Sequence, residues 1–282
     1  MVLESLVTPV TAERHPLTQI FLGASYATIG IFLSLWVFEE YATLVMIFLT
    51  TIAGVPLFYY TVKFEEEKHL VIWQESKLLW EHSKALMFLM CLFIGASVAF
   101  AFWYLVLPSD WTASLFSAQT QTIVSLNQKV TGNALQFNIL TKIFLNNVKV
   151  MIFCILFSFI YGTGALFILM WNASVIGVAL GNFFRVRAAD VANLVGLSAA
   201  AGYLKVTSFS ILRYALHGIP EILAYIIAGL AGGIISIAII RHDFGTDNFE
   251  RIVLDASDLI LIGVGVLFFA AIIEVYLTPL FF

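Results

Sequence analysis

Charged residues are scarce in this chain. Only 11% of its 282 residues are Asp, Glu, Lys or Arg, whereas 61% are hydrophobic. A soluble domain carries about 25% charged residues, and no soluble fold could bury this much apolar surface. The deficit of charged residues excludes a soluble globular protein and indicates that the chain lies in a bilayer. We therefore expect the lipid bilayer to be one partner of the chain.

The chain also lacks blocks of basic residues and a cysteine framework. Its net charge is −4 and no run of Lys and Arg occurs, so we expect no nucleic-acid partner. Cys91 and Cys154 are the only cysteines, and both lie inside apolar runs. We therefore expect buried, unreactive thiols and no disulfide. The first apolar run, 20–38, lacks the small-residue cleavage site of a signal peptide.

Long apolar runs dominate what is present. A spanning helix needs about 20 such residues. The sequence therefore predicts an all-α, polytopic transmembrane helical bundle of about seven spanning helices. They are expected at 19–38, 42–62, 84–107, 145–171, 190–210, 219–240 and 257–279.

One further apolar stretch, 173–184, is too short to cross. We interpret it as a re-entrant or interfacial segment, which is tolerated only where protein covers its backbone. We divide the chain into an N-terminal transmembrane hairpin (1–62), a cytoplasmic helical stalk (63–83) and a membrane core (84–282).

The distribution of Lys and Arg predicts the orientation. With the N-terminus in the cytoplasm, nine basic residues fall inside and five outside, as the positive-inside rule prefers. The inner set is Arg14, Lys63, Lys68, Lys77, Lys84, Arg185, Arg187, Arg241 and Arg251, and the outer set is Lys129, Lys142, Lys149, Lys205 and Arg213. We expect a multi-pass protein of the plasma membrane.

Two long connections have different characters. The first, 63–83, mixes charges of both signs, including Glu66, His69, Glu81 and His82. These side chains could form a metal site, but such alternation is typical of a solvated helical face, which is our interpretation. The second, 108–142, is amphipathic and external on this topology. It could lie in the interface, form a dimer contact or cap the outer face.

Polar residues from four expected helices fall at one level, near the outer leaflet. Ionisable groups inside a spanning region are costly, so each suggests a functional site. The candidates are Asn146, Asn147, Arg213, His217, Glu221 and Glu274, and Lys205 lies at the same level in the expected helix 190–210.

His217 and Glu221 are four residues apart and share one helix face. Pro220 is favoured in a first helical turn, so Glu221 could simply stabilise a helix start and pair with Arg213 or Lys205. The alternative is a divalent metal such as zinc, held by His217, Glu221 and Glu274 with Asn147 in support. The spacing differs from His-Glu-x-x-His, so no catalytic residue is assigned.

Small residues form a second pattern. Such residues let helices approach closely in lipid, either within the chain or along a homodimer seam. The packing candidates are Gly162, Gly164, Gly177, Gly181, Gly229 and Gly233. Asn172 follows Trp171 at the expected end of a helix, where it could cap free carbonyls.

Several of these landmarks together resemble the stage II sporulation protein M family. They are Asn146-Asn147, Gly162-x-Gly164, Asn172, Gly177, His217-Gly218-Ile219-Pro220-Glu221 and Gly229-x-x-Gly232, within residues 84–282. The resemblance implies a polytopic membrane protein. In spore formers the namesake works with cell-wall hydrolases during engulfment, as a scaffold without catalysis of its own. This chain departs from the pattern in its N-terminal hairpin and at Ala173, where a Gly is expected.

Three functions remain open from the sequence. The first is a non-enzymatic, homodimeric scaffold for unidentified membrane or envelope proteins. The second is a proton- or cation-coupled transporter or channel that uses His217, Glu221 and Glu274. The third is a membrane-embedded, metal-dependent hydrolase. The small-residue faces and the lack of a catalytic motif favour the scaffold.

Overall fold

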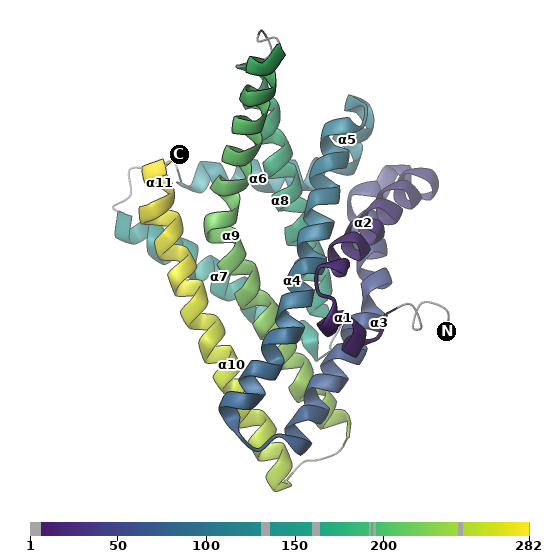
Figure 1. The fold of residues 1–282 in the computed structure, drawn as a ribbon, viewed down its shortest axis with the longest axis vertical. Coiled ribbons are helices and arrows are strands. Elements are labelled where there is room, and N and C mark those ends of the chain that lie inside the picture. The colour runs from purple at the N-terminus through teal and green to yellow at the C-terminus, as the bar shows by residue number, and fades with distance from the viewer. Residues whose placement is uncertain are drawn as a thin grey trace.

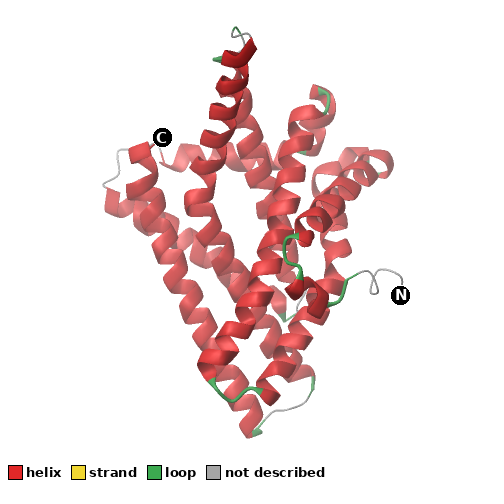
Figure 2. Cartoon of the chain, viewed as in Figure 1, coloured by secondary structure: helices red, strands yellow, loops and turns green. Residues whose placement is uncertain are grey.

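The chain is a bundle of long helices joined by short loops (Figure 2). The computed structural model describes residues 7–130, 136–159, 164–191, 193, 196–241 and 245–281. Within them the helical elements are α1 (Pro9–Arg14), α2 (Thr18–Val37), η2 (Glu39–Tyr41), α3 (Ala42–Val71), α4 (Glu75–Val106), α5 (Ser109–Leu115), α6 (Ser117–Val130), α7 (Gln136–Ser158), α8 (Gly164–Ala189), α9 (Gly196–Ile240), α10 (Asp247–Ile272), η3 (Ile273–Leu277) and α11 (Thr278–Phe281).

Seven of the described helices are long and apolar enough to cross a membrane, which confirms the predicted class and number. They are α2, α3, α4, α7, α8, α9 and the α10–α11 unit. Figure 1 shows the α3–α4 connection, the end of α9 and the start of α10 at the narrow end of the molecule. The C-terminus and α5 lie toward the opposite, wide end.

The predicted re-entrant segment is wrong. Residues 173–184 lie inside the spanning helix α8, and the predicted crossing 145–171 is divided between α7 and α8. Two glycines explain the length of α8: a Cβ on Gly177 would lie 2.7 Å from Phe100 Cβ, and one on Gly181 would lie 2.6 Å from the Tyr104 ring. Close packing on α4 therefore covers a stretch whose apolar run looked too short.

The predicted helices 190–210 and 219–240 are also wrong as separate elements. One helix of 45 residues, α9, contains both, and Pro220 lies in its interior instead of its first turn. Proline removes one backbone hydrogen bond, but in spanning helices neighbouring groups can satisfy the freed carbonyl. The surrounding helices, which bury most of α9 from Gly218 onward, hold this helix continuous.

The division of 145–171 and the joining of 190–210 to 219–240 leave the number of long apolar helices at seven. They change which basic residues lie at each end of the bundle. Because α8 crosses fully, Arg185 and Arg187 lie toward the wide end, with the set predicted to be external. The excess of nine over five becomes seven on each side. The count then favours neither orientation, and a cytoplasmic N-terminus stays a prediction.

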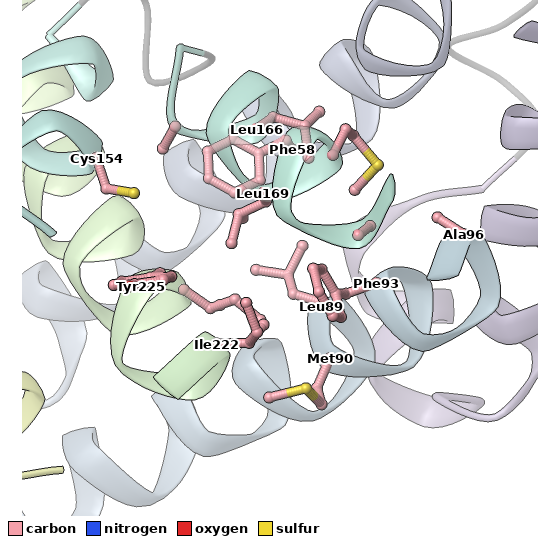
Figure 3. Packing of buried hydrophobic residues seen from close by; sticks show 14 of the residues in the cluster. Phe58, Leu89, Met90, Phe93, Ala96, Cys154, Leu166, Leu169, Ile222 and Tyr225 are labelled. Carbon is pink, nitrogen blue, oxygen red and sulfur yellow. The ribbon is translucent and has the colours of Figure 1, made fainter. Parts of the chain in front are cut away.

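The apolar core lies between α3, α4, α8 and α9. Figure 3 shows Phe58, Leu89, Leu166, Leu169 and Ile222 converging from these helices, and each is at most 5% exposed. The connection 108–142 contributes to this packing as a cap. Buried Gln119 of α6 donates to Ser174 Oγ of α8 at 3.1 Å and accepts from Thr43 Oγ1 of α3 at 3.1 Å.

Candidate functional site

The Glu221 group is the first of two polar centres and consists of Glu221, Tyr225 and Glu274. Glu221 and Tyr225 are one turn apart on α9, and the Tyr225 hydroxyl donates to Glu221 Oε1 at 2.8 Å. Tyr225 is fully buried, whereas Glu221 is half-buried. Glu274 of the last spanning helix interacts electrostatically with both. Two helices distant in sequence thus bring both predicted carboxylates together.

A local change of helix type marks the position of Glu274. It lies in η3, a π-helical turn of five residues. The backbone N–H and the hydroxyl of Thr278 both donate to the Ile273 carbonyl, the hydroxyl at 3.1 Å. Such turns inside α-helices are frequent at functional sites. The turn moves Glu274 out of the regular register of α10.

Helix α7 forms the third wall of this centre. It buries Asn147, Met151, Cys154 and Ser158, which repeat every three or four residues. Ser158 Oγ donates to the Gly229 carbonyl of α9 at 2.9 Å, and Cys154 is 0% exposed. Figure 3 shows Cys154 and Tyr225 on adjacent helices. Asn146 is exposed, so only Asn147 of the predicted pair faces the interior.

The remaining predicted polar residues lie apart from the Glu221 group. Arg213 stacks over the ring of Phe183 on α8, 5.1 Å from its centroid. Among the ion pairs of the described residues, none joins Glu221 to Arg213 or Lys205. His217 is half-buried, and its Nδ1 atom has no hydrogen-bond partner in the described part of the chain.

The described residues hold no group of three or more His, Cys, Asp or Glu side chains that could bind a metal ion. His217, Glu221 and Glu274 are all described, so this conformation does not gather the predicted ligand set. The metal ion there stays a prediction.

The predicted packing glycines that the structure describes pack against other helices of the same chain. Gly229 lies against Ala165 of α8, and Gly233 lies against Val62 of α3, each with less than 3 Å for an added Cβ. Gly164 abuts the Phe157 carbonyl, and Gly162 lies outside the described residues. The helix-end role predicted for Asn172 is wrong, because Asn172 is in the middle of α8 and donates to the Ile168 carbonyl at 2.8 Å.

The second polar centre lies in 63–83, where the prediction of a solvated helical face is wrong. Glu65, Glu66 and His69 are 0% exposed and His82 is 1% exposed. They join α3, α4 and α10 at the narrow end. We call this set the ionic centre: Glu13, Glu65, Lys68, His69, His82 and Asp255.

Lys68 organises the carboxylates of the ionic centre. Its Nζ atom lies 2.9 Å from Glu13 Oε1 and 2.8 Å from Glu65 Oε1. Burial, together with the neighbouring Glu65 carboxyl group, raises the pKa of Glu13 from 4.5 to about 7. One lysine thus holds two acidic side chains.

The two histidines each pair with a carboxylate. His82 Nδ1 lies 2.7 Å from Glu65 Oε2, and His69 Nδ1 lies 2.9 Å from Asp255 Oδ2. A periodic signal could have revealed this centre: Leu78, His82, Ala85 and Leu89 are all buried at helical spacing on α4. His82 therefore lies on the same buried face of α4 as these apolar residues. A residue of a solvated face would lie on the opposite side of the helix.

A second ionic contact closes the same end. Arg241, which follows α9, lies 2.8 Å from Glu66 Oε2 and 3.0 Å from Glu67 Oε1. The guanidinium group therefore ties the end of α9 to α3.

Comparison with known proteins gives one match. The family model of stage II sporulation protein M matches residues 85–279. The chain belongs to the stage II sporulation protein M family. No curated protein and no solved structure matches it.

The family match divides the two centres. The whole Glu221 group lies inside residues 85–279, the part that matches the stage II sporulation protein M family. Of the ionic centre, only Asp255 lies inside it, while Glu13, Glu65, Lys68 and His69 precede it and His82 is three residues before its start. The ionic centre therefore joins residues that precede the matched part to Asp255, which lies inside it.

Proposed function

We propose that this chain is a non-enzymatic membrane scaffold that works as a homodimer. The observation that carries the proposal is a row of exposed apolar residues on the first half of α9. Leu197, Leu204 and Ile211 are 88%, 69% and 54% exposed and recur every seven residues. A seven-residue apolar repeat is the pattern by which two helices pack along each other.

Small residues accompany this row. Ala201 and Ser208, each four residues after a leucine, are also exposed. Alternating large and small positions let a second helix approach closely. The row therefore has both the bulk and the space that a helix pair needs.

The length of α9 supports a role outside the chain's own bundle. At 1.5 Å per residue its 45 residues extend about 68 Å, roughly twice the hydrocarbon core. The second half, from Gly218, is buried between neighbouring helices, whereas the first half is mostly exposed. Figure 1 shows the start of α9 and the end of α8 rising beyond the other helices.

A second copy is the occupant that this surface suits best. Two copies in one membrane have the same orientation, so their α9 helices would meet in parallel about a two-fold axis. Each row would then face its own counterpart, as a self-complementary interface requires. The dimer would leave the outer surface of each bundle free for other membrane or envelope proteins.

Cysteine cross-linking tests the dimer. Leu204→Cys in the full chain, reconstituted in vesicles and mildly oxidised, should give a covalent dimer. Leu261→Cys is the matched control, because Leu261 is 67% exposed on α10 outside the row. The native Cys91 and Cys154 are buried and are present in both variants. Equal cross-linking of the two variants, or a monomeric mass together with no cross-link, would contradict the dimer.

Proton- or cation-coupled transport is the second candidate, and the Glu221 group favours it. Two carboxylates beside a π-helical turn within spanning helices are suited to accepting and releasing a cation. In liposomes, Glu221→Gln and Glu274→Gln should abolish flux driven by a proton or sodium gradient. Flux that is unchanged in both variants would eliminate this candidate.

A further inference from the structure

Two buried histidine nitrogens in the ionic centre have no partner. His69 and His82 are 0% and 1% exposed, and neither Nε2 atom makes a hydrogen bond within the described part of the chain. A buried polar atom without a partner destabilises the folded state. Two such atoms on neighbouring rings indicate that something binds them.

The other ring nitrogens determine what Nε2 can bind. An ionised carboxylate only accepts hydrogen bonds, so Nδ1 of each ring donates to Asp255 or to Glu65. Nε2 then carries a lone pair and no proton. Histidines that bind metals have this arrangement, in which a carboxylate orients the ring and increases its basicity.

The spacing of the rings fits one shared ion. The ring centroids of His69 and His82 are 5.2 Å apart, with 39° between their planes. Two imidazoles bound to one tetrahedral metal at about 2.0–2.1 Å have centroids roughly 5 Å apart. The rings are therefore spaced as two ligands of a single ion.

The surrounding charge and space also fit a cation. Three carboxylates, from Glu13, Glu65 and Asp255, surround the rings, and Lys68 contacts two of them. A cavity of about 10 Å³ adjoins His82 and Asp255 and is lined also by Glu75 and Asp258. This is about the space of one water molecule. Arg251 stacks on Trp73, 4.4 Å from its ring centroid. Among the ion pairs of the described residues, Asp255 pairs with His69 and not with Arg251.

We propose that His69 and His82 bind one divalent transition-metal ion of the zinc class through their Nε2 atoms. No third His, Cys, Asp or Glu of the described residues is close enough to complete a ligand group. Water in the adjoining cavity supplies the remaining positions. The ion would fasten α3 of the N-terminal hairpin to α4. Through Asp255, which positions His69, it would connect the hairpin to the family core.

Zinc content tests this site. The full chain, freed of any affinity tag, is treated with chelator, exposed to Zn²⁺, desalted and analysed by elemental mass spectrometry. Wild type should retain about one Zn²⁺ per chain. The double variant His69→Asn with His82→Asn should retain none. The Asn side-chain amide can still donate where Nδ1 does, so the variant removes Nε2 and leaves the carboxylate contacts.

Controls separate this site from the one predicted at His217. His217→Asn should keep the zinc, and circular dichroism should show the helical content of the double variant unchanged. Asp255→Asn should weaken Zn²⁺ binding about 10–100-fold, because Asp255 only orients His69. Equal zinc in wild type and the folded double variant, loss of zinc in His217→Asn, or no zinc in wild type would each overturn the proposal. If the double variant unfolds, His69→Asn alone and the Co²⁺ visible spectrum decide in the same way.

Discussion

The two polar centres differ in how their charges are satisfied. In the Glu221 group, two carboxylates have one side-chain hydrogen bond among the described residues, from the Tyr225 hydroxyl. The ionic centre pairs each of its carboxylates with a lysine or a histidine within 2.9 Å. Both are surrounded by apolar helices. The first is typical of a group that changes its protonation or partner, and the second of a permanent connection.

This difference has a physical basis. A buried ion pair that loses one partner leaves an uncompensated charge, which costs about 3–5 kcal/mol. Side-chain hydrogen bonds in a membrane protein contribute about 0.6 kcal/mol on average, and we use this magnitude for the Tyr225–Glu221 bond within α9. We therefore expect substitutions in the ionic centre to affect stability much more than substitutions in the Glu221 group.

Glu65→Ala should have the largest effect. It removes the partner of both Lys68 and His82, so the free energy of unfolding should fall by about 3–5 kcal/mol. Equilibrium unfolding in mixed micelles, followed by circular dichroism, measures this change. Glu67→Ala is the control, because Glu67 is 47% exposed and its substitution should cost less than about 1 kcal/mol. Equal losses in the two variants would remove the contrast between the centres.

Glu13→Gln should change the pH dependence. The folded pKa of Glu13, about 7, exceeds its ordinary value of 4.5, so the folded state binds the proton more tightly. The resulting stability is fully present below about pH 4.5 and is lost as the pH rises through 7. Wild type should therefore lose about 1–3 kcal/mol more than Glu13→Gln between pH 5 and pH 8. Melting temperatures of both proteins across this range test it, and parallel pH profiles would contradict it.

Tyr225→Phe should have a smaller effect. It deletes the hydroxyl that donates to Glu221 and leaves the ring in the core. The free energy of unfolding should fall by about 0.6 kcal/mol and by no more than about 1.7 kcal/mol. Tyr276→Phe is the matched control, because Tyr276 is 41% exposed. A loss as large as that of Glu65→Ala would show that the Glu221 group is also a structural connection.

Glu221→Gln should have the smallest effect. The amide oxygen can still accept from Tyr225, and the electrostatic interaction with Glu274 is relieved. The free energy of unfolding should change by less than about 0.6 kcal/mol in either direction. Glu221→Leu, which removes the acceptor, should cost at least as much as Tyr225→Phe. Unfolding in the same micelles gives both values, and the reverse order would contradict the role of Glu221 as acceptor.

Some elements were predictable because composition alone defines them. The runs 19–38, 42–62, 84–107 and 257–279 coincide closely with parts of α2, α3, α4 and the α10–α11 unit. The exceptions involve Pro220 and the segment 173–184. Local rules favour a helix start at a proline and reject a short apolar run as a crossing, but tertiary packing overrode both.

The candidate site was predictable in part for a similar reason. Glu221 and Glu274 stand out because a carboxylate inside an apolar run is rare, whichever helices surround it. Glu65, His69 and His82 did not stand out, because their neighbours in sequence are charged. Their burial depends on Asp255, which is 186 residues from His69 in the chain.

Composition and run length by themselves determined that this is a helical membrane protein, because the hydrophobic effect and the thickness of a bilayer act on each run separately. The number of seven long apolar helices agrees with the prediction because the division of 145–171 and the joining of 190–210 to 219–240 offset each other. Only the tertiary structure decided which polar residues are buried, where the long helices begin and end, and which side Arg185 and Arg187 face. These properties depend on contacts between helices that are far apart in the sequence, and a contact of that kind leaves no local pattern.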